Sequence, residues 1–258
     1  VNLTSVGGQY QYRKDKWNGI FTLSNAITTQ SNRNLEAKIT YRHNDKNAVT
    51  FTYQNISKLP DNAFNLYQSG FEKYNWNNNF NNEKINNLTI LATTQWFDAS
   101  AQITTLDDYL YYSNDTNTEH YQYITPKQYT GTIKYLSAKI SKEIKFKKFA
   151  LDNTILYQQT AQTNDILNVP KLVTRNTIYF SDYYFKRALY LQTGITCNYF
   201  TKYYANDYNP VIADFFVQNQ KQIGNFPMLD FFVNARIRQT RIFVIAEHFN
   251  SSFTGNTY

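Results

Sequence analysis

Basic side chains that could attract anions gather near the C-terminal end of the chain. Arg236, Arg238 and Arg241 surround one short predicted turn. Because successive side chains of a strand point to opposite faces, their spacing of two puts Arg236 and Arg238 on the same polar face. Positive charge held at one place raises the local concentration of anions. These three residues therefore predict a site that attracts anions.

Further charges are expected at the same end of the fold. These basic residues flank other short predicted turns: Arg13, Lys14, Lys16, Arg42, Lys46, Lys145, Lys147, Lys148, Lys186 and Arg187. Charges beside turns also anchor a chain at lipid headgroups, and the sequence leaves both interpretations open. A second set, Glu36, Lys38 and Arg42, shares one face of its strand, where opposite charges could pair across an enclosed lumen.

No enzyme constellation is found in the sequence. Acyl hydrolysis needs a nucleophile, a base and an orienting group in contact. The three histidines, His43, His120 and His248, have no ligand spacing and no partner motif. Asp107–Asp108 are adjacent, so their side chains would point to opposite faces of a strand. Cys197 is the only cysteine and falls in the apolar register of its strand. We expect no enzyme activity, no cofactor and no metal site.

Composition excludes several classes of protein. Mean hydropathy is -0.58 and hydrophobic residues make up 42% of the chain, which is too polar for a helical membrane protein. No apolar run reaches the roughly 18 residues that a transmembrane helix needs. The net charge is +7, but no nucleic-acid-binding motif, basic helix or phosphate loop accompanies it. We therefore expect no nucleic-acid partner.

The elements that must position the charged residues are strands. Leu35, Ala37, Ile39 and Tyr41 alternate with polar residues without a break, which is typical of a strand with one apolar and one polar face. The same alternation recurs along the chain. It predicts twelve strands, at 4–14, 17–26, 34–43, 48–56, 85–96, 99–111, 128–144, 149–159, 170–181, 186–202, 228–238 and 242–252. Tyr135 and Leu136 conflict in phase, which predicts a bulge.

Short and long connections alternate between these strands. The long ones are 27–33, 57–84, 112–127, 160–169 and 203–227, and segment 71–87, rich in Asn, is predicted to be a solvated loop whose aromatic residues could stack on sugars. Outer-membrane barrels have short periplasmic turns and long extracellular loops, with the apolar face toward lipid. The predicted fold is therefore all-β, a transmembrane antiparallel up-and-down β-barrel with at least twelve strands. A soluble all-β protein is the alternative fold.

Aromatic residues near the predicted strand ends support this interpretation. Trp17, Trp96, Tyr183 and Tyr184 are candidates for the aromatic girdles that lie at the two membrane interfaces. The chain opens at Val1 without Met, and 254–258 look like the start of a loop. We therefore expect one barrel domain over residues 1–258 that is a fragment of a longer chain and lacks terminal strands.

The C-terminal third of the sequence resembles a known family. The segments DYYFKRALYLQTG, YYANDYNP, FFVNARIRQTRIF and EHFN, between residues 182 and 250, carry the likeness. They resemble the putative porin family of Bacteroidota outer membranes. The resemblance implies an outer-membrane β-barrel, localisation in the bacterial outer membrane, and relatives that are longer at both ends.

Two functions are compatible with these observations. The first is a porin-like barrel that allows passive diffusion of small polar solutes, with an anion bias from Arg236 and Arg238. The second is a structural or accessory barrel subunit of a larger outer-membrane complex for secretion, uptake or insertion. The expected partners are outer-membrane lipid and, for the second function, other outer-membrane proteins or lipoproteins.

Overall fold

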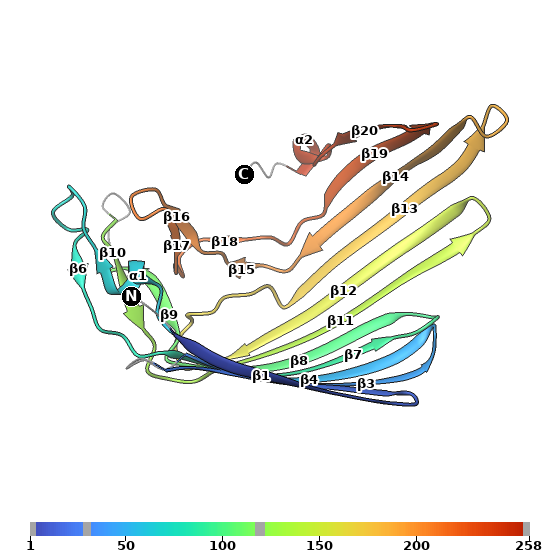
Figure 1. Cartoon of the computed structure of the whole chain (residues 1–258). Helices are drawn as coiled ribbons and strands as arrows, with labels where there is room; N and C mark the ends of the chain where they lie inside the picture. The colour runs from blue at the N-terminus through green and yellow to red at the C-terminus, as the bar shows by residue number, and fades with distance from the viewer. Residues whose placement is uncertain (1–3, 28–31, 117–121, 255–258) are drawn as a thin grey trace.

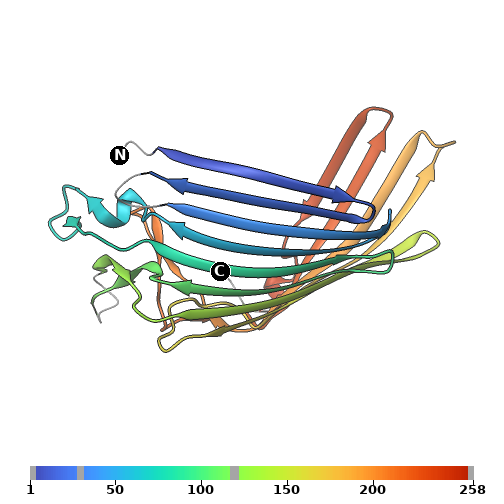
Figure 2. The ribbon, with the colours of Figure 1, turned by 60° about the horizontal axis from the view of Figure 1, so that its bottom comes forward.

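A single curved sheet makes up most of the molecule (Figures 1 and 2). The structure is a computed structural model that describes residues 4–27, 32–116 and 122–254. Its 12-stranded sheet is antiparallel throughout and follows chain order. The strands are β1 (Ser5–Lys14), β2 (Trp17–Ala26), β3 (Arg33–Asn44), β4 (Asn47–Lys58), β7 (Glu83–Thr93), β8 (Asp98–Asp107), β11 (Ile133–Phe146), β12 (Phe149–Ala161), β13 (Leu172–Tyr184), β14 (Leu189–Phe200), β19 (Met228–Ile237) and β20 (Thr240–Ala246).

The twelve predicted strands are confirmed, with shifted ends. Strand β11 begins at Ile133 instead of residue 128, because β10 (Ile124–Gln128) pairs with β9 (Leu110–Asn114) in a separate hairpin. Strand β20 stops at Ala246 and is followed by a short helix, α2 (Ser251–Thr254). Strands β1 and β20 form the two edges of the sheet and do not pair with each other within the described ranges.

Short turns lie at one end of the sheet and long connections at the other (Figure 1). The long connections contain small elements of their own. They are α1 (Asn62–Asn65), β5 (Leu66–Tyr67), β6 (Trp76–Asn77), β9, β10, β15 (Tyr203–Tyr204), β16 (Asp207–Asn209), β17 (Asp214–Phe216) and β18 (Gln222–Ile223). None of the described helices has the length and apolar character needed to cross a membrane.

Residues that pair across neighbouring strands form rows that run across the sheet, and most rows are either apolar or polar. One apolar row runs from Phe21 through Ala37, Tyr53 and Leu88 to Ile103. Directly paired residues of antiparallel strands lie on the same face. The register therefore gives one side of the wall a nearly continuous apolar surface in these strands.

The two faces differ in exposure. Large apolar side chains on the apolar face are open to the outside, as for Ile178 at 56%. On the polar face Thr104, Gln158 and Thr196 are buried, Thr196 at 5%. Side chains converge on the concave side of a curved sheet and diverge on the convex side. The difference therefore identifies the polar face as the inner one.

The outer face also carries polar residues, for example in one row between apolar rows. Lys142 pairs with Asn153, and Asn153 pairs with Asn176, between rows that hold Ile140 and Ile144. A lysine near the end of a strand can extend its long side chain toward the interface. The segregation of apolar from polar residues is thus strong but not complete.

The bulge predicted from Tyr135 and Leu136 is wrong. Strand β11 keeps an unbroken register with both neighbours. Tyr135 lies on the polar face, where its hydroxyl donates to Oε1 of Gln158 at 2.7 Å, so a tyrosine fits either face and need not break the phase. A register shift occurs instead between Arg42 and Asn44.

Candidate functional site

The inner face of the wall is a ladder of hydrogen-bonded polar side chains. Nε2 of Gln54 donates to Oε2 of Glu36 at 2.7 Å. The hydroxyls of Thr40 and Thr50 lie 3.0 Å apart, and those of Thr177 and Thr196 lie 2.9 Å apart. These contacts follow directly from pairing in register. They make a polar surface that can stay hydrated without large movements of side chains.

The structure places Glu36, Lys38 and Arg42 on this inner face. They alternate with Ala37, Ile39 and Tyr41 along β3 and share the face of Thr40. Glu36 binds the Gln54 amide, and Lys38 lies opposite Thr52. No ion pair joins these three residues to one another in the part of the chain that the structure describes.

Arg236 and Arg238 share a hollow but not a strand. Arg236 lies on the inner face in β19, whereas β19 ends at Ile237 and Arg238 begins the turn with a left-handed φ of 53°. The turn breaks the alternation, so the spacing of two does not place Arg238 on the inner strand face. Both residues nevertheless line one hollow of about 440 Å³ at the short-turn end, together with Tyr183, Arg187, Ala188, Tyr190, Gln239 and Arg241. We call it the arginine hollow.

The four girdle candidates occupy different positions. Trp17 lies on the outer face, with its ring centroid 4.8 Å from that of Tyr41, and Tyr184 pairs with Leu189 on the same face. Trp96 is exposed in the turn between β7 and β8. Tyr183 differs from the expectation. It pairs with Tyr190, which pairs with Arg236, so its register puts it on the inner face.

The long connections fold together into a compact cap at one end of the wall. Its core consists of Tyr74, Tyr112, Ile124 and Phe216. These residues come from three connections that are far apart in sequence. Partly buried residues packed on this core are Phe64, Tyr67, Trp76, Val211 and Ile212. The apolar core of the described chain therefore lies largely in the cap and not within the sheet.

Hydrogen bonds join the three connections of the cap. The Tyr67 hydroxyl donates to the Val211 carbonyl at 2.6 Å, and the Tyr74 hydroxyl donates to the Gln122 carbonyl at 2.8 Å. The buried amide of Asn209 donates to Oε1 of Gln122 at 3.1 Å. These bonds cross between connections, so the cap is one packed unit and not three independent loops.

The predicted solvated loop at 71–87 is therefore wrong in part. Tyr74 is buried, and Trp76 stacks on Tyr67 with ring centroids 4.8 Å apart. The cap could not be predicted from the sequence because its elements are too short for a periodic pattern to show. One sign of the cap is visible in the sequence. Four aromatic residues lie within one polar segment: Phe64, Tyr67, Tyr74 and Trp76.

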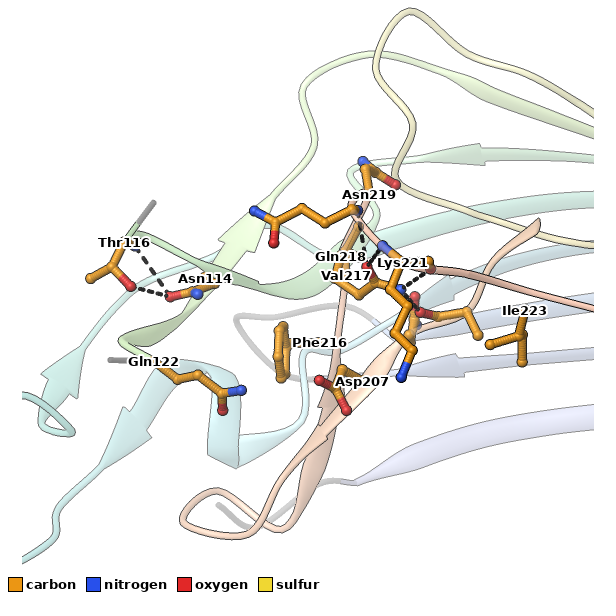
Figure 3. A pocket seen from close by; sticks show the side chains of 13 residues that line it. Asn114, Thr116, Gln122, Asp207, Phe216, Val217, Gln218, Asn219, Lys221 and Ile223 are labelled. Atoms are coloured by element: carbon orange, nitrogen blue, oxygen red, sulfur yellow. Dashed lines mark hydrogen bonds between the residues drawn. The ribbon is translucent and has the colours of Figure 1, made fainter. Parts of the chain in front are cut away.

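A polar hollow of about 720 Å³ opens in the cap (Figure 3). Amide side chains dominate its wall, among them Asn114, Gln122, Gln218 and Asn219, and Lys221 and Asp207 add charge. The amide of Gln218 donates to the Lys221 carbonyl at 2.8 Å, which holds that wall in place. The hollow can contact polar solutes that approach from the cap side.

Tyr112 stays neutral to a higher pH than an exposed tyrosine because of its place in the cap core. Burial raises its pKa well above the usual 10.0, and the nearby carboxylates Asp214 and Asp61 raise it further. A group with a raised folded-state pKa stabilises the fold fully below its unfolded pKa and loses that contribution as pH rises through the folded value. Tyr112 therefore supports the cap throughout the physiological pH range.

The residues first considered for catalysis or metal binding are dispersed. His43 lies at the register shift in β3, and the backbone of His248 donates to Asp230 at 2.8 Å in the turn after β20. His120 lies outside the described residues. Asp108 pairs with Lys84 at 2.9 Å. Across the described ranges, no three His, Cys, Asp or Glu side chains gather as a metal site would require.

Comparison with known proteins identifies a family that matches this chain and solved structures that share its fold. The sequence profile of a family described as putative porin matches residues 1–258. No curated protein sequence matches the chain. Among solved structures, the siderophore receptor PirA from Acinetobacter baumannii matches 96% of this chain with a TM-score of 0.63 and 13% identity. The match covers 41% of PirA.

Two further solved structures have a similar fold. The ferric enterobactin receptor PfeA from Pseudomonas aeruginosa matches 96% of this chain over 40% of its own, with a TM-score of 0.63 and 9% identity. The FrpB iron transporter from Neisseria meningitidis matches 96% of this chain over 41% of its own, with a TM-score of 0.59 and 11% identity. The chain thus spans about two fifths of the length of these structures, and at such identities the likeness concerns the fold alone.

Proposed function

Because the chain belongs to the putative porin family, we propose that it forms part of the wall of a water-filled barrel through which small polar solutes diffuse passively. The protein lies in the bacterial outer membrane, and its fold is that of an outer-membrane β-barrel. The observation that carries the proposal is the segregation of the two faces, apolar outside and hydrogen-bonded polar inside. Such a polar face is favourable against water and unfavourable against lipid.

We further propose a weak preference for anions. Lys38, Arg42 and Arg236 lie on the inner face, and Arg238 and Arg241 stand at its short-turn end. Charged rings and patches along a pore select ions of opposite sign. The cap restricts the opposite end, where its hydrogen-bonded core limits the size of solutes that enter.

Conductance measurements on the full-length protein test both parts of this proposal. Reconstitution into planar bilayers should give discrete current steps, and the reversal potential in a salt gradient should show anions permeating faster than cations. Absence of steps would contradict the diffusion pathway. Steps with a marked cation preference would contradict the anion bias and leave the pathway intact.

The polar row on the outer face favours a second candidate function. Lys142, Asn153 and Asn176 lie side by side on the outer face, between rows that hold apolar residues. We propose, as the alternative, that this row contacts another outer-membrane protein or a lipoprotein within a larger complex. Extraction in mild detergent would then recover a partner that is lost when Asn153 and Asn176 are changed to Leu. A monodisperse single protein would contradict it.

A further inference from the structure

We propose that the arginine hollow is a specific binding site for a phosphate group. The inference deepens the proposed function, because it places a saturable anion site at the short-turn end of the same inner face. Four guanidinium groups, from Arg187, Arg236, Arg238 and Arg241, line one hollow. Arginine presents a planar fork of N–H donors that matches phosphate oxygens in pairs.

The sheet register places two of these charges directly opposite each other. Arg236 pairs with Arg241 across the β19–β20 hairpin. Like charges that face each other on neighbouring strands destabilise a sheet. Such a pair is costly in an empty site and becomes favourable when an anion lies between the two side chains.

The two turns add the remaining guanidinium groups. Arg238 follows β19 with a φ of 53°, and Arg187 lies between β13 and β14 with a φ of 70°. Both backbones are left-handed, a conformation that costs energy for residues other than glycine. The two hairpins are neighbours in the sheet because β14 pairs with β19. Their turns therefore bring charges from separate segments to one place.

No carboxylate neutralises this cluster. The residues lining the hollow include no Asp or Glu, and within the described part of the chain none of the four arginines takes part in an ion pair. Two acidic residues on nearby strands are already engaged. Asp182 binds Lys148, and Glu143 binds Lys145 and Tyr179. The positive charge is left for an external anion.

Aromatic rings hold one guanidinium in position. The guanidinium carbon of Arg236 lies 5.4 Å from the centre of the Tyr190 ring, and Nη2 of Arg236 donates to the Tyr183 hydroxyl at 3.4 Å. The Tyr183 and Tyr190 rings are themselves 5.0 Å apart. An arginine over an aromatic face keeps its N–H edge free for a ligand. Tyr183 takes part in this stack because its register places it on the inner face.

The phosphate group could belong to a dissolved solute or to a lipid. The hollow lies where the strands end, so both the aqueous phase and a headgroup layer are within reach of it. Inorganic phosphate is the probe that tests the shared chemistry. Its binding to the full-length protein in a neutral detergent can be measured by isothermal titration at fixed ionic strength, which separates a site from general charge attraction.

Two double variants, one inside the arginine hollow and one outside it, show whether phosphate binding depends on the hollow. Arg236→Gln combined with Arg238→Gln should weaken phosphate binding at least about tenfold, because hydrogen bonds to charged groups are the strong ones. Lys46→Gln combined with Lys147→Gln removes the same charge from other turns at this end. It should change phosphate binding by less than about twofold, as expected for exposed charges. Absence of saturable phosphate binding, or an equal loss in both double variants, would overturn the proposal.

A second arm identifies the source of the phosphate. Lipid nanodiscs of phosphatidylglycerol should abolish phosphate binding if headgroups fill the site, whereas micelles of a neutral detergent without phosphate should preserve it. Equal binding in discs and micelles assigns the site to a dissolved solute, and either result supports the site. The phosphate-binding measurement does not depend on whether the protein transports solutes. Phosphate binding without conductance would contradict only the proposed diffusion pathway, and conductance without phosphate binding would contradict only this site.

Discussion

Replacing Ile90 by Arg is expected to lower the free energy of unfolding in lipid vesicles by about 2–4 kcal/mol. Ile90 lies on the outer face in β7, paired with Phe51 on one side and Ala101 on the other. An arginine there would have to leave water for the hydrocarbon layer. Urea titration of the reconstituted protein, followed by tryptophan emission, measures the change.

Thr89 provides the matched control for this prediction. It is the preceding residue in β7, so its side chain points to the inner face, and it pairs with Thr52 and Gln102. Thr89→Arg adds the same charge at the same depth but to the solvated side. We expect a loss below about 1 kcal/mol, because an inner-face charge stays in water and mainly alters selectivity. Equal losses for the two variants would mean that the faces do not differ in environment.

Truncating Phe216 is expected to loosen the cap without unfolding the wall. Phe216 is 3% exposed in the cap core beside Tyr112 and Ile124. Phe→Ala changes in cores typically cost 3–5 kcal/mol through lost burial and the remaining cavity, so about this much of the stability of the cap should be lost. Faster proteolysis within the cap and larger, noisier single-channel currents should follow.

Phe215→Ala serves as the control, since Phe215 is the neighbour of Phe216 in β17 and is 58% exposed. It should leave both proteolysis and current unchanged. A folded barrel and its heat-unfolded form differ in mobility on a detergent gel. Both variants should keep this difference, because the wall stays folded. If Phe216→Ala also abolished that difference, the cap and the wall would be a single cooperative unit.

The wall could be predicted from sequence because lipid on one side and water on the other favour an alternation of apolar and polar residues in most strands. Strands such as β3 and β19 show that pattern along most of their length, and a one-residue slip would reverse both faces. The family resemblance in the C-terminal third is confirmed over the whole chain.

The cap could not be predicted in the same way. Its strands are two to five residues long, which is too short for alternation to show. Its core depends on contacts between distant segments, such as Val217 with Tyr112. Nothing in the local sequence of either segment specifies that pairing. Aromatic residues inside polar loops were the one visible sign.

The arginine hollow was predictable in part. The basic residues around residue 238 are visible in the sequence, and the structure does bring Arg236, Arg238 and Arg241 together. Their arrangement was not predictable, because the turn removes Arg238 from the strand register. The contribution of Tyr183 was missed since a tyrosine suits a membrane interface and an inner face equally well.

Nitroxide scanning along β7 shows whether the apolar face of the wall meets lipid and the polar face meets water. Single labels at residues 87 to 93, in a Cys197→Ala background in lipid vesicles, report whether oxygen dissolved in lipid or a water-soluble nickel complex reaches each position. We expect accessibility to alternate with a period of two, with Leu88 and Ile90 open to oxygen and Asn87 and Thr89 open to nickel. Shielding of Leu88 and Ile90 from both reagents would show that the apolar face packs against protein and that the chain is not the wall of a membrane barrel.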